Sequence, residues 1–184
     1  MPHRTPQAVV IGSSDAPPEA CRDAWRIGAM LAHRGVIVVT GGGGGVMEEA
    51  CRGAREAGGT TVGILPGDRL DAANPWCSVV VPTGLGHARN AVTALAGDLV
   101  VVVGGAAGTL SEVSLAWIHD RPVLALTAHG GWAERLGGRG VDERPRPPVV
   151  ACPTLDDLER EVDAILAARG VVRSPRRPPS EEAP

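Results

Sequence analysis

Short apolar runs alternate along the chain with longer segments whose apolar residues recur at helical spacing. The runs occupy residues 7–11, 36–39, 60–65, 77–81, 98–103, 123–126 and 149–152. Such short, mostly continuous apolar runs are typical of strands buried on both faces of a sheet. Helical spacing occurs at residues 20–31, 46–54, 88–95, 109–117 and 158–165. This alternation predicts an α/β fold: a doubly wound, mostly parallel sheet with helices on both faces, in three αβα layers.

Residues 98–112 combine a buried strand, a glycine-rich turn and a helix start. Thr109 and Glu112 match a capping box, in which an N-cap threonine is answered three residues later by a glutamate. Unpaired backbone N–H groups at a helix start lie at the positive end of the helix dipole and suit a phosphate. We therefore expect residues 104–109 to bind an anion. The capping box is also a purely structural explanation of Glu112, because a capping carboxylate is not free to act on water.

Two further small-residue turns follow predicted strands. One is Gly12, Ser13 and Ser14, and the other is the run Gly41–Gly45. Five consecutive glycines carry a large entropic cost on ordering, which favours close approach to a ligand over a flexible connector. Because ligands of such sheets bind beyond the carboxyl ends of the strands, the three turns are expected to converge on one site. A dinucleotide-binding fingerprint can be matched here only weakly, since no acidic residue clearly ends the next strand.

Arg89 and Asn90 fall in the first turn of a predicted helix. A cation there works against the helix dipole, so Arg89 has no helix-stabilising reason for its position. A guanidinium that grips a phosphate or carboxylate is one explanation. A solvated surface arginine is the other, and position alone does not decide between them.

Length and charge limit the class of protein. The 184 residues predict one domain over residues 1–169, followed by a disordered tail, residues 170–184, rich in Pro, Arg, Ser and Glu. The net charge of −3 argues against nucleic acid as the main partner. No apolar run approaches twenty residues and the first residues lack the apolar core of a signal peptide, so we expect a cytoplasmic protein without a membrane span. Residues 128–148 are rich in Gly and Pro and predict an irregular loop over the site.

Residue usage excludes two kinds of chemistry. Every basic side chain other than histidine is arginine, so the chain alone offers no lysine for a pyridoxal-phosphate Schiff base or a Walker A loop. The four cysteines, at 21, 51, 77 and 152, show no zinc-site spacing and are expected to be small buried residues, with no metal site.

Several motifs in order resemble those of the LOG-like Rossmann-fold family, formerly mislabelled "lysine decarboxylase". The branch most similar to the chain contains molybdenum cofactor carrier proteins and bacterial nucleotide-binding proteins. The motifs, between about residues 8 and 126, are Thr40–Met47, Gly63–Gly67, Pro82–Gly86 with Ala88–Asn90, and Gly104–Glu112. The resemblance implies a Rossmann-like fold and a homo-oligomer, most simply a dimer.

The resemblance also implies site residues and two activities. The LOG enzymes cleave the N-glycosidic bond of a cytokinin riboside 5′-monophosphate. The resemblance implies that Arg89 and Glu112 correspond to their catalytic pair. The resemblance further implies that Gly105, Gly108 and Thr109 hold the phosphate. Gly104, Ala106 and Asn90 depart from the enzyme pattern, and the arginine–asparagine pair also occurs in the carrier branch.

Our main expectation is a protein that binds a small phosphorylated, nucleotide-type ligand and requires no cofactor. The alternatives are a nucleoside 5′-monophosphate phosphoribohydrolase and a molybdenum cofactor carrier, with the nucleotide or the cofactor as bound molecule. The expected ligand-binding residues are Gly12, Ser13, Ser14, Gly42, Gly43, Gly44, Asn90, Gly104, Gly105, Ala106, Ala107, Gly108 and Thr109.

Overall fold

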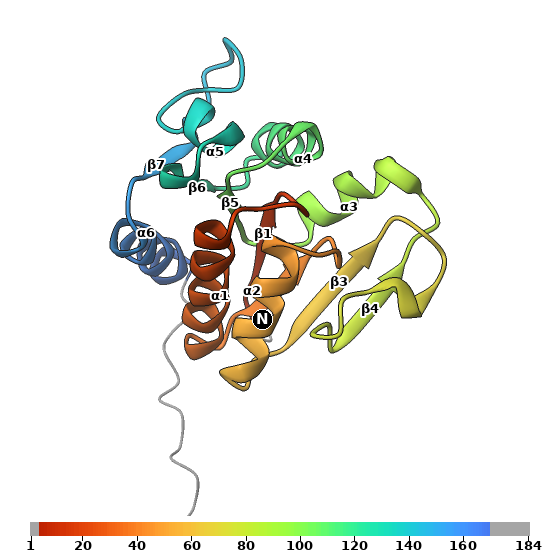
Figure 1. Cartoon of the computed structure of the whole chain (residues 1–184). Coiled ribbons are helices and arrows are strands. Elements are labelled where there is room, and N and C mark those ends of the chain that lie inside the picture. The colour runs from red at the N-terminus through yellow and green to blue at the C-terminus, as the bar shows by residue number, and fades with distance from the viewer. Residues whose placement is uncertain (1–3, 170–184) are drawn as a thin grey trace, which may run out of the picture.

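The computed structural model describes residues 4–169, which form one seven-stranded sheet flanked by helices (Figure 1). The strands are β1 (Gln7–Gly12), β2 (Ile37–Thr40), β3 (Thr61–Leu65), β4 (Val79–Pro82), β5 (Leu99–Val103), β6 (Val123–Leu126) and β7 (Val150–Cys152). The α-helices are α1 (Pro18–His33), α2 (Val46–Glu56), α3 (Arg89–Leu95), α4 (Ala107–Ile118), α5 (Gly131–Leu136) and α6 (Leu155–Ala168). Three short 3₁₀ turns are η1 (Leu70–Ala72), η2 (Gly86–Ala88) and η3 (Thr127–His129).

The strand order is β4-β3-β2-β1-β5-β6-β7, and every neighbouring pair is parallel. The chain builds outward from β1 to β4, then returns to the other side of β1 and builds outward from β5 to β7. The strand order therefore reverses beside β1 and β5, where α/β sheets of this kind open a crevice. The predicted α/β fold with a doubly wound parallel sheet is confirmed, and it is Rossmann-like.

The sheet is buried on both faces because its strands direct apolar side chains alternately into two cores. Ala8 and Val10 of β1 pack with α1, α2 and α6, whereas Val9 and Ile11 pack with α3, α4 and α5 (Figure 1). All five residues of β5 are buried, as expected for a central strand.

The segment of residues 128–148 is more ordered than we expected. The prediction of an irregular loop is wrong for its first part, where η3 ends at His129 and α5 follows over Gly131–Leu136. Gly130 and Gly131 have positive φ angles of 66° and 63°, which let the chain turn from β6 into α5. Glycines that look like loop residues in the sequence therefore introduce a short helix.

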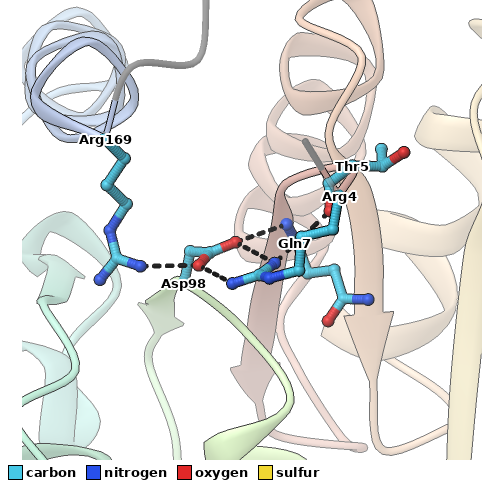
Figure 2. Close-up of polar contacts among 5 residues, drawn as sticks. All are labelled: Arg4, Thr5, Gln7, Asp98 and Arg169. Carbon is cyan, nitrogen blue, oxygen red and sulfur yellow. Dashed lines mark hydrogen bonds and ion pairs between the residues drawn. The ribbon is translucent and has the colours of Figure 1, made fainter. Parts of the chain in front are cut away.

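Asp98 ties together the two ends of the described chain at the amino end of β5 (Figure 2). Its buried carboxylate accepts a hydrogen bond of 2.9 Å from Arg4 Nη1, one of 3.0 Å from the Gln7 backbone and one of 2.6 Å from Arg169 Nη1. Burial alone would raise the pKa of Asp98, but the bonds from Arg4 and Gln7 and the charges of both arginines bring it below its usual value. This network lies at the amino ends of β1 and β5, whereas the glycine-rich turns follow the carboxyl ends of the strands.

Two sequence predictions concern other parts of the chain. No helix within residues 4–169 has the length and apolar character needed to cross a membrane. The predicted disordered tail, residues 170–184, lies outside the described residues.

Candidate functional site

Three small-residue turns lie side by side at the carboxyl ends of β1, β2 and β5. Gly12 pairs with Val103 in the sheet register, which sets the turn after β1 beside the turn after β5. Val46 N–H donates a hydrogen bond of 3.1 Å to the Ser13 carbonyl, which joins the turn after β1 to the Gly41–Gly45 run. The expected convergence of the three turns is therefore present in the structure.

Close backbone contacts explain why some of these positions are glycine. Gly45 has a φ of 60°, and a Cβ there would lie 2.5 Å from the Ser13 carbonyl oxygen. Gly105 has a φ of 101°, and a Cβ there would lie 2.5 Å from Thr109 Cγ2. Any L-side chain would be strained at either position. The tight turns are thus required by the fold itself, and they bring backbone N–H groups close to the surface.

The start of α4 differs from the sequence prediction. The N-cap is Ala106, no side chain caps the helix, and Thr109 is its third residue. The predicted Thr109–Glu112 capping box is therefore wrong. Gly104 and Gly105, both at positive φ, turn the chain into the helix before Thr109 is reached. A capping box does form in the chain, but at Thr154 and Asp157 at the start of α6.

This helix start leaves donors available to a ligand. Residues 106–108 are exposed, and the first helical hydrogen bond runs from Leu110 N–H to the Ala106 carbonyl. The N–H groups that precede Leu110 lie at the positive end of the α4 dipole. An anion placed against residues 106–109 would meet these donors, as the sequence predicts for the turn.

Glu112 lies on α4 as a mostly buried carboxyl group. The residue is 8% exposed, and no donor within residues 4–169 forms a hydrogen bond or ion pair with its carboxyl group. Burial raises the pKa of Glu112 to about 7, and the positive charge of Arg89 opposes that rise. The carboxyl group can therefore change its protonation state near neutral pH, a property suited to acid–base chemistry.

Arg89, in the first turn of α3, interacts electrostatically with Glu112. Its Nη1 donates a hydrogen bond of 2.8 Å to the Ile64 carbonyl, at the end of β3. A Cβ on Gly41 would lie 2.3 Å from Nη1, so the guanidinium rests directly on the glycine run. Nε is buried without a partner among the described residues, and burial lowers the pKa of Arg89 while Glu112 opposes that change. The guanidinium is therefore not a fully solvated surface group, and its role in holding a phosphate or carboxylate stays a prediction.

Asn90 connects α3 to the turn before α4 through a residue that the sequence does not single out. Its Nδ2 donates a hydrogen bond of 2.6 Å to Ser111 Oγ, which in turn donates one of 2.8 Å to the Gly108 carbonyl. Asn90 is 8% exposed, so its amide needs such a partner. The only sequence signal for Ser111 is its place within the motif Gly104–Glu112.

Comparison with known proteins gives this geometry a family context. A model of the SLOG cluster4 family matches residues 5–144, which is well over half of the chain. The chain belongs to this family. Its members share the LOG-like fold, so the resemblance found in the motifs is confirmed.

Three proteins have sequences similar to that of this SLOG cluster4 chain. It is 38% identical over 120 residues to an uncharacterized protein of Archaeoglobus fulgidus, covering 65% of the chain and 79% of the relative. It is 30% identical to a cytokinin riboside 5′-monophosphate phosphoribohydrolase of Mycobacterium tuberculosis, over 67% of the chain and 71% of that enzyme. A probable enzyme of the same activity from Oryza sativa subsp. japonica is 34% identical over 66% of the chain, and the chain spans only 58% of its length.

Solved structures add the carrier branch. The molybdenum cofactor carrier protein of Chlamydomonas reinhardtii superposes with a TM-score of 0.79 at 34% identity, covering 89% of this chain and 99% of the carrier. The match therefore extends over nearly the whole carrier. Phosphoribohydrolases and a cofactor carrier are both relatives of this SLOG cluster4 protein.

A histidine that the sequence analysis passed over lies beside the turn in this SLOG cluster4 protein. His129 Nε2 is 2.9 Å from Asp23 Oδ2 of α1, and the His129 carbonyl oxygen lies 3.4 Å from where a Cβ on Gly104 would be. The following segment also contacts the turn, because Ala133 N–H donates to the Gly104 carbonyl at 2.9 Å. Within residues 4–169 no group of three or more His, Cys, Asp or Glu side chains could hold a metal ion.

Proposed function

We propose that the protein binds the phosphate group of a nucleotide-type ligand at the turn of residues 104–109. The observation that carries this proposal is the uncapped, exposed start of α4, together with the half-buried guanidinium of Arg89, which interacts electrostatically with Glu112 of the same helix. The backbone N–H groups supply fixed donors, and Arg89 supplies positive charge in a poorly hydrated place. Close approach of a ligand is supported by the absence of Cβ atoms at Gly104, Gly105 and Gly108.

Calorimetric titration with AMP and other nucleoside monophosphates tests this proposal. Adenosine is the matched control ligand, because it keeps the base and the ribose but lacks the phosphate. We expect AMP to bind and adenosine to bind at least about tenfold more weakly, since the phosphate interacts with charged and dipolar groups. If no nucleoside monophosphate binds at millimolar concentration, the proposal is rejected.

The geometry around Glu112 supports a second candidate, a nucleoside 5′-monophosphate phosphoribohydrolase. Glu112 is not engaged in a capping box, and its carboxyl pKa of about 7 makes it available as a carboxylate or as an acid. In this reaction the bond between C1′ and the base breaks, water adds to C1′, and the products are the free base and ribose 5-phosphate. Glu112 as a carboxylate would stabilise the positive charge at C1′ or take a proton from the water, and Arg89 would hold the phosphate.

Chromatographic detection of released base separates binding from catalysis. Glu112→Gln keeps the size of the side chain but removes its charge, and Glu134→Gln, which changes an exposed carboxylate within α5, is the matched control. The proposal predicts that base release falls by about a hundredfold or more in Glu112→Gln, the lower end of what a general acid–base group contributes, and is unchanged in Glu134→Gln. Equal rates in wild type and Glu112→Gln would reject the role of Glu112.

The third candidate is a carrier of molybdenum cofactor, supported by the similarity to the Chlamydomonas reinhardtii carrier. The terminal phosphate of the cofactor would use the same turn, and no glycosidic bond would be cleaved. Purification from a host that makes the cofactor, followed by fluorescence analysis for oxidised pterin, tests this candidate. Pterin in the wild type but not in Arg89→Gln would favour the carrier, whereas none in either would exclude it. The homo-oligomer and the cytoplasmic location stay predictions.

A further inference from the structure

Two cysteine thiols lie next to each other beneath the glycine run. Cys51 Sγ of α2 and Cys77 Sγ, which precedes β4, are 3.9 Å apart although the residues are 26 positions apart in sequence. Cys51 is fully buried, and Cys77 is partly exposed. The thiols of the other two cysteines lie near backbone carbonyls instead, Cys21 near Ala16 and Cys152 near Val150. One pair among the four cysteines is therefore placed for joint chemistry.

The surroundings of Cys51 favour its thiolate. Thr40 is fully buried, and its Oγ1 lies 3.4 Å from Cys51 Sγ while it accepts a hydrogen bond of 3.1 Å from Gly42 N–H. The Thr40 hydroxyl hydrogen needs an acceptor, and the sulfur provides one. Donation by the Cys77 thiol and the Thr40 hydroxyl brings the pKa of Cys51 below its usual value, whereas donation to Cys51 and burial raise the pKa of Cys77. Thr40 therefore favours a thiolate within the pair, and the partly exposed Cys77 is the sulfur nearer to solvent.

The pair is connected to the glycine run through Asn74. The Asn74 backbone N–H donates a hydrogen bond of 2.8 Å to the Gly42 carbonyl, and its Nδ2 donates one of 2.9 Å to the Gly43 carbonyl. Cys77 follows three residues later, with its sulfur against the backbone of β3, where a Cβ on Gly63 would lie 2.6 Å away. A shift of Cys77 therefore also shifts Asn74, which donates the two hydrogen bonds to the glycine run.

We propose that Cys51 and Cys77 are a modification site, a dithiol that a hydroperoxide converts to an intramolecular disulfide. A thiolate of the pair attacks a peroxide oxygen, the O–O bond breaks, and that cysteine becomes a sulfenic acid as hydroxide leaves. The other sulfur of the pair then attacks the sulfenic sulfur, the S–O bond breaks, and water leaves as the disulfide forms. Two thiols and one hydrogen peroxide give one disulfide and two water molecules, a two-electron oxidation.

Disulfide formation is expected to move the glycine run. The sulfur atoms must approach from 3.9 Å to about 2 Å, so the segment of Cys77 and Asn74 moves toward α2. Arg89 rests on Gly41 in the same run, so a shift of the run also shifts the guanidinium. We expect the disulfide to weaken AMP binding by about tenfold, because displacement of such groups by about 1 Å is enough to loosen a site. This last expectation, unlike the disulfide itself, rests on the proposed function.

Peptide mapping of the folded, full-length protein tests the disulfide. Protein treated with hydrogen peroxide is blocked with N-ethylmaleimide, digested with trypsin and analysed without reduction. Trypsin places Cys51 in peptide 35–52, Cys77 in 70–89, Cys21 in 5–22 and Cys152 in 140–160. We expect a linked species of peptides 35–52 and 70–89 that dithiothreitol separates. Alkylated Cys51 and Cys77 after peroxide, or links mainly to peptides 5–22 or 140–160, would overturn the proposal.

Variants distinguish a poised pair from general oxidation. Cys51→Ser and Cys77→Ser each leave one thiol of the pair, so oxidation should stop at a sulfenic acid that dimedone traps in at least one of these two variants. Cys21→Ser and Cys152→Ser are the matched controls and should give as much linked peptide as wild type. Loss of the linked peptide in either control, or no dimedone adduct in both Cys51→Ser and Cys77→Ser, would contradict the proposal.

Titration with AMP before and after oxidation tests the effect on the site. If the disulfide forms and reduced protein does not bind AMP, the proposed function fails while the modification site stands. If reduced protein binds AMP and the oxidised protein binds equally well, the connection between the dithiol and the site is rejected. About tenfold weaker binding after oxidation that dithiothreitol reverses, absent in Cys77→Ser, supports both.

Discussion

Asn90 Nδ2 donates a hydrogen bond of 2.6 Å to Ser111 Oγ, and this bond joins the first turn of α3 to α4. Ser111 Oγ passes the connection on to the Gly108 carbonyl, inside the proposed phosphate turn. The residue beside Arg89 and the turn after β5 are thus held in one arrangement. This chain of bonds lets the position of α3 determine the position of the turn.

Ser111→Ala tests the connection. It removes both hydrogen bonds and leaves the Asn90 amide without its partner, so we expect AMP binding to weaken by about fivefold, the effect of one neutral hydrogen bond. Calorimetric titration measures the change, and circular dichroism checks that the variant is folded. The matched control is Ser114→Ala, one turn further along α4, where Oγ donates only to the Leu110 carbonyl at 2.9 Å. Equal affinity in the two variants would contradict a positioning role for Ser111.

Gly41→Ala tests the contact between the glycine run and Arg89. Its Cβ would lie 2.3 Å from Arg89 Nη1 and 2.8 Å from Met47 Sδ, so the guanidinium must move away from the Ile64 carbonyl. We expect the free energy of unfolding to fall by about 1–3 kcal/mol, as overpacking does, and AMP binding to weaken. Urea unfolding and titration measure the two effects.

Gly44→Ala is the control from the same run. A Cβ there would lie 3.7 Å from Glu48 Oε2 and 3.8 Å from the Ser14 carbonyl oxygen, both ordinary contact distances. Gly44 is not among the residues with positive φ. We expect its unfolding free energy to stay close to wild type. A loss as large as that of Gly41→Ala would show that glycine freedom, rather than the contact with Arg89, explains the run.

Local sequence patterns were sufficient to predict most of the fold. The apolar run of β5 and the helical spacing of α2 each depend on the burial of their own residues, and periodicity reports that burial directly. The doubly wound, parallel arrangement followed from general rules for such sheets, whereas the order of the strands was not predicted. The prediction of a capping box at α4 was wrong because the residue types of Thr109 and Glu112 carry no information on the backbone before them. The positive φ angles of Gly104 and Gly105 turn the chain into the helix earlier.

Contacts between distant segments explain the rest of what was missed. Ser111 and Asn74 act through partners on other elements, and no local pattern marks such partners. Gly28 of α1 looks like a weak helix position, yet a Cβ there would lie 2.0 Å from the Ala50 carbonyl oxygen of α2. The sequence therefore predicted which turns would form the candidate site, but not which bonds would fix their relative positions.

Asp98→Asn tests the network that joins the ends of the described chain. The folded-state pKa of Asp98 is below its usual value, so its contribution to stability is present above pH of about 4 and is lost as pH falls through the folded-state pKa. We expect Asp98→Asn to lower the free energy of unfolding by about 1–2 kcal/mol at pH 7 and to match wild type near pH 2. Asp142→Asn, which removes an exposed ion pair with Arg144, should be indistinguishable from wild type at both pH values. An effect of Asp98→Asn that does not change with pH would show that the charge is not responsible.

Glu112→Gln tests whether the buried carboxyl group titrates near neutral pH. Its folded-state pKa of about 7 lies above the ordinary glutamate value, so the folded protein holds a proton there that the unfolded chain has already lost. The carboxyl group therefore reduces stability as pH rises from about 4.5 through 7, by roughly 3 kcal/mol at 1.36 kcal/mol per pKa unit. Glutamine does not titrate, so the unfolding free energy of Glu112→Gln relative to wild type should increase by about this amount as the pH rises from 5 to 8. Urea unfolding of both proteins at these two pH values isolates the effect, because every other group is shared. A constant difference between the two proteins would mean that Glu112 is ionised throughout, and its assignment as an acid at neutral pH would be withdrawn.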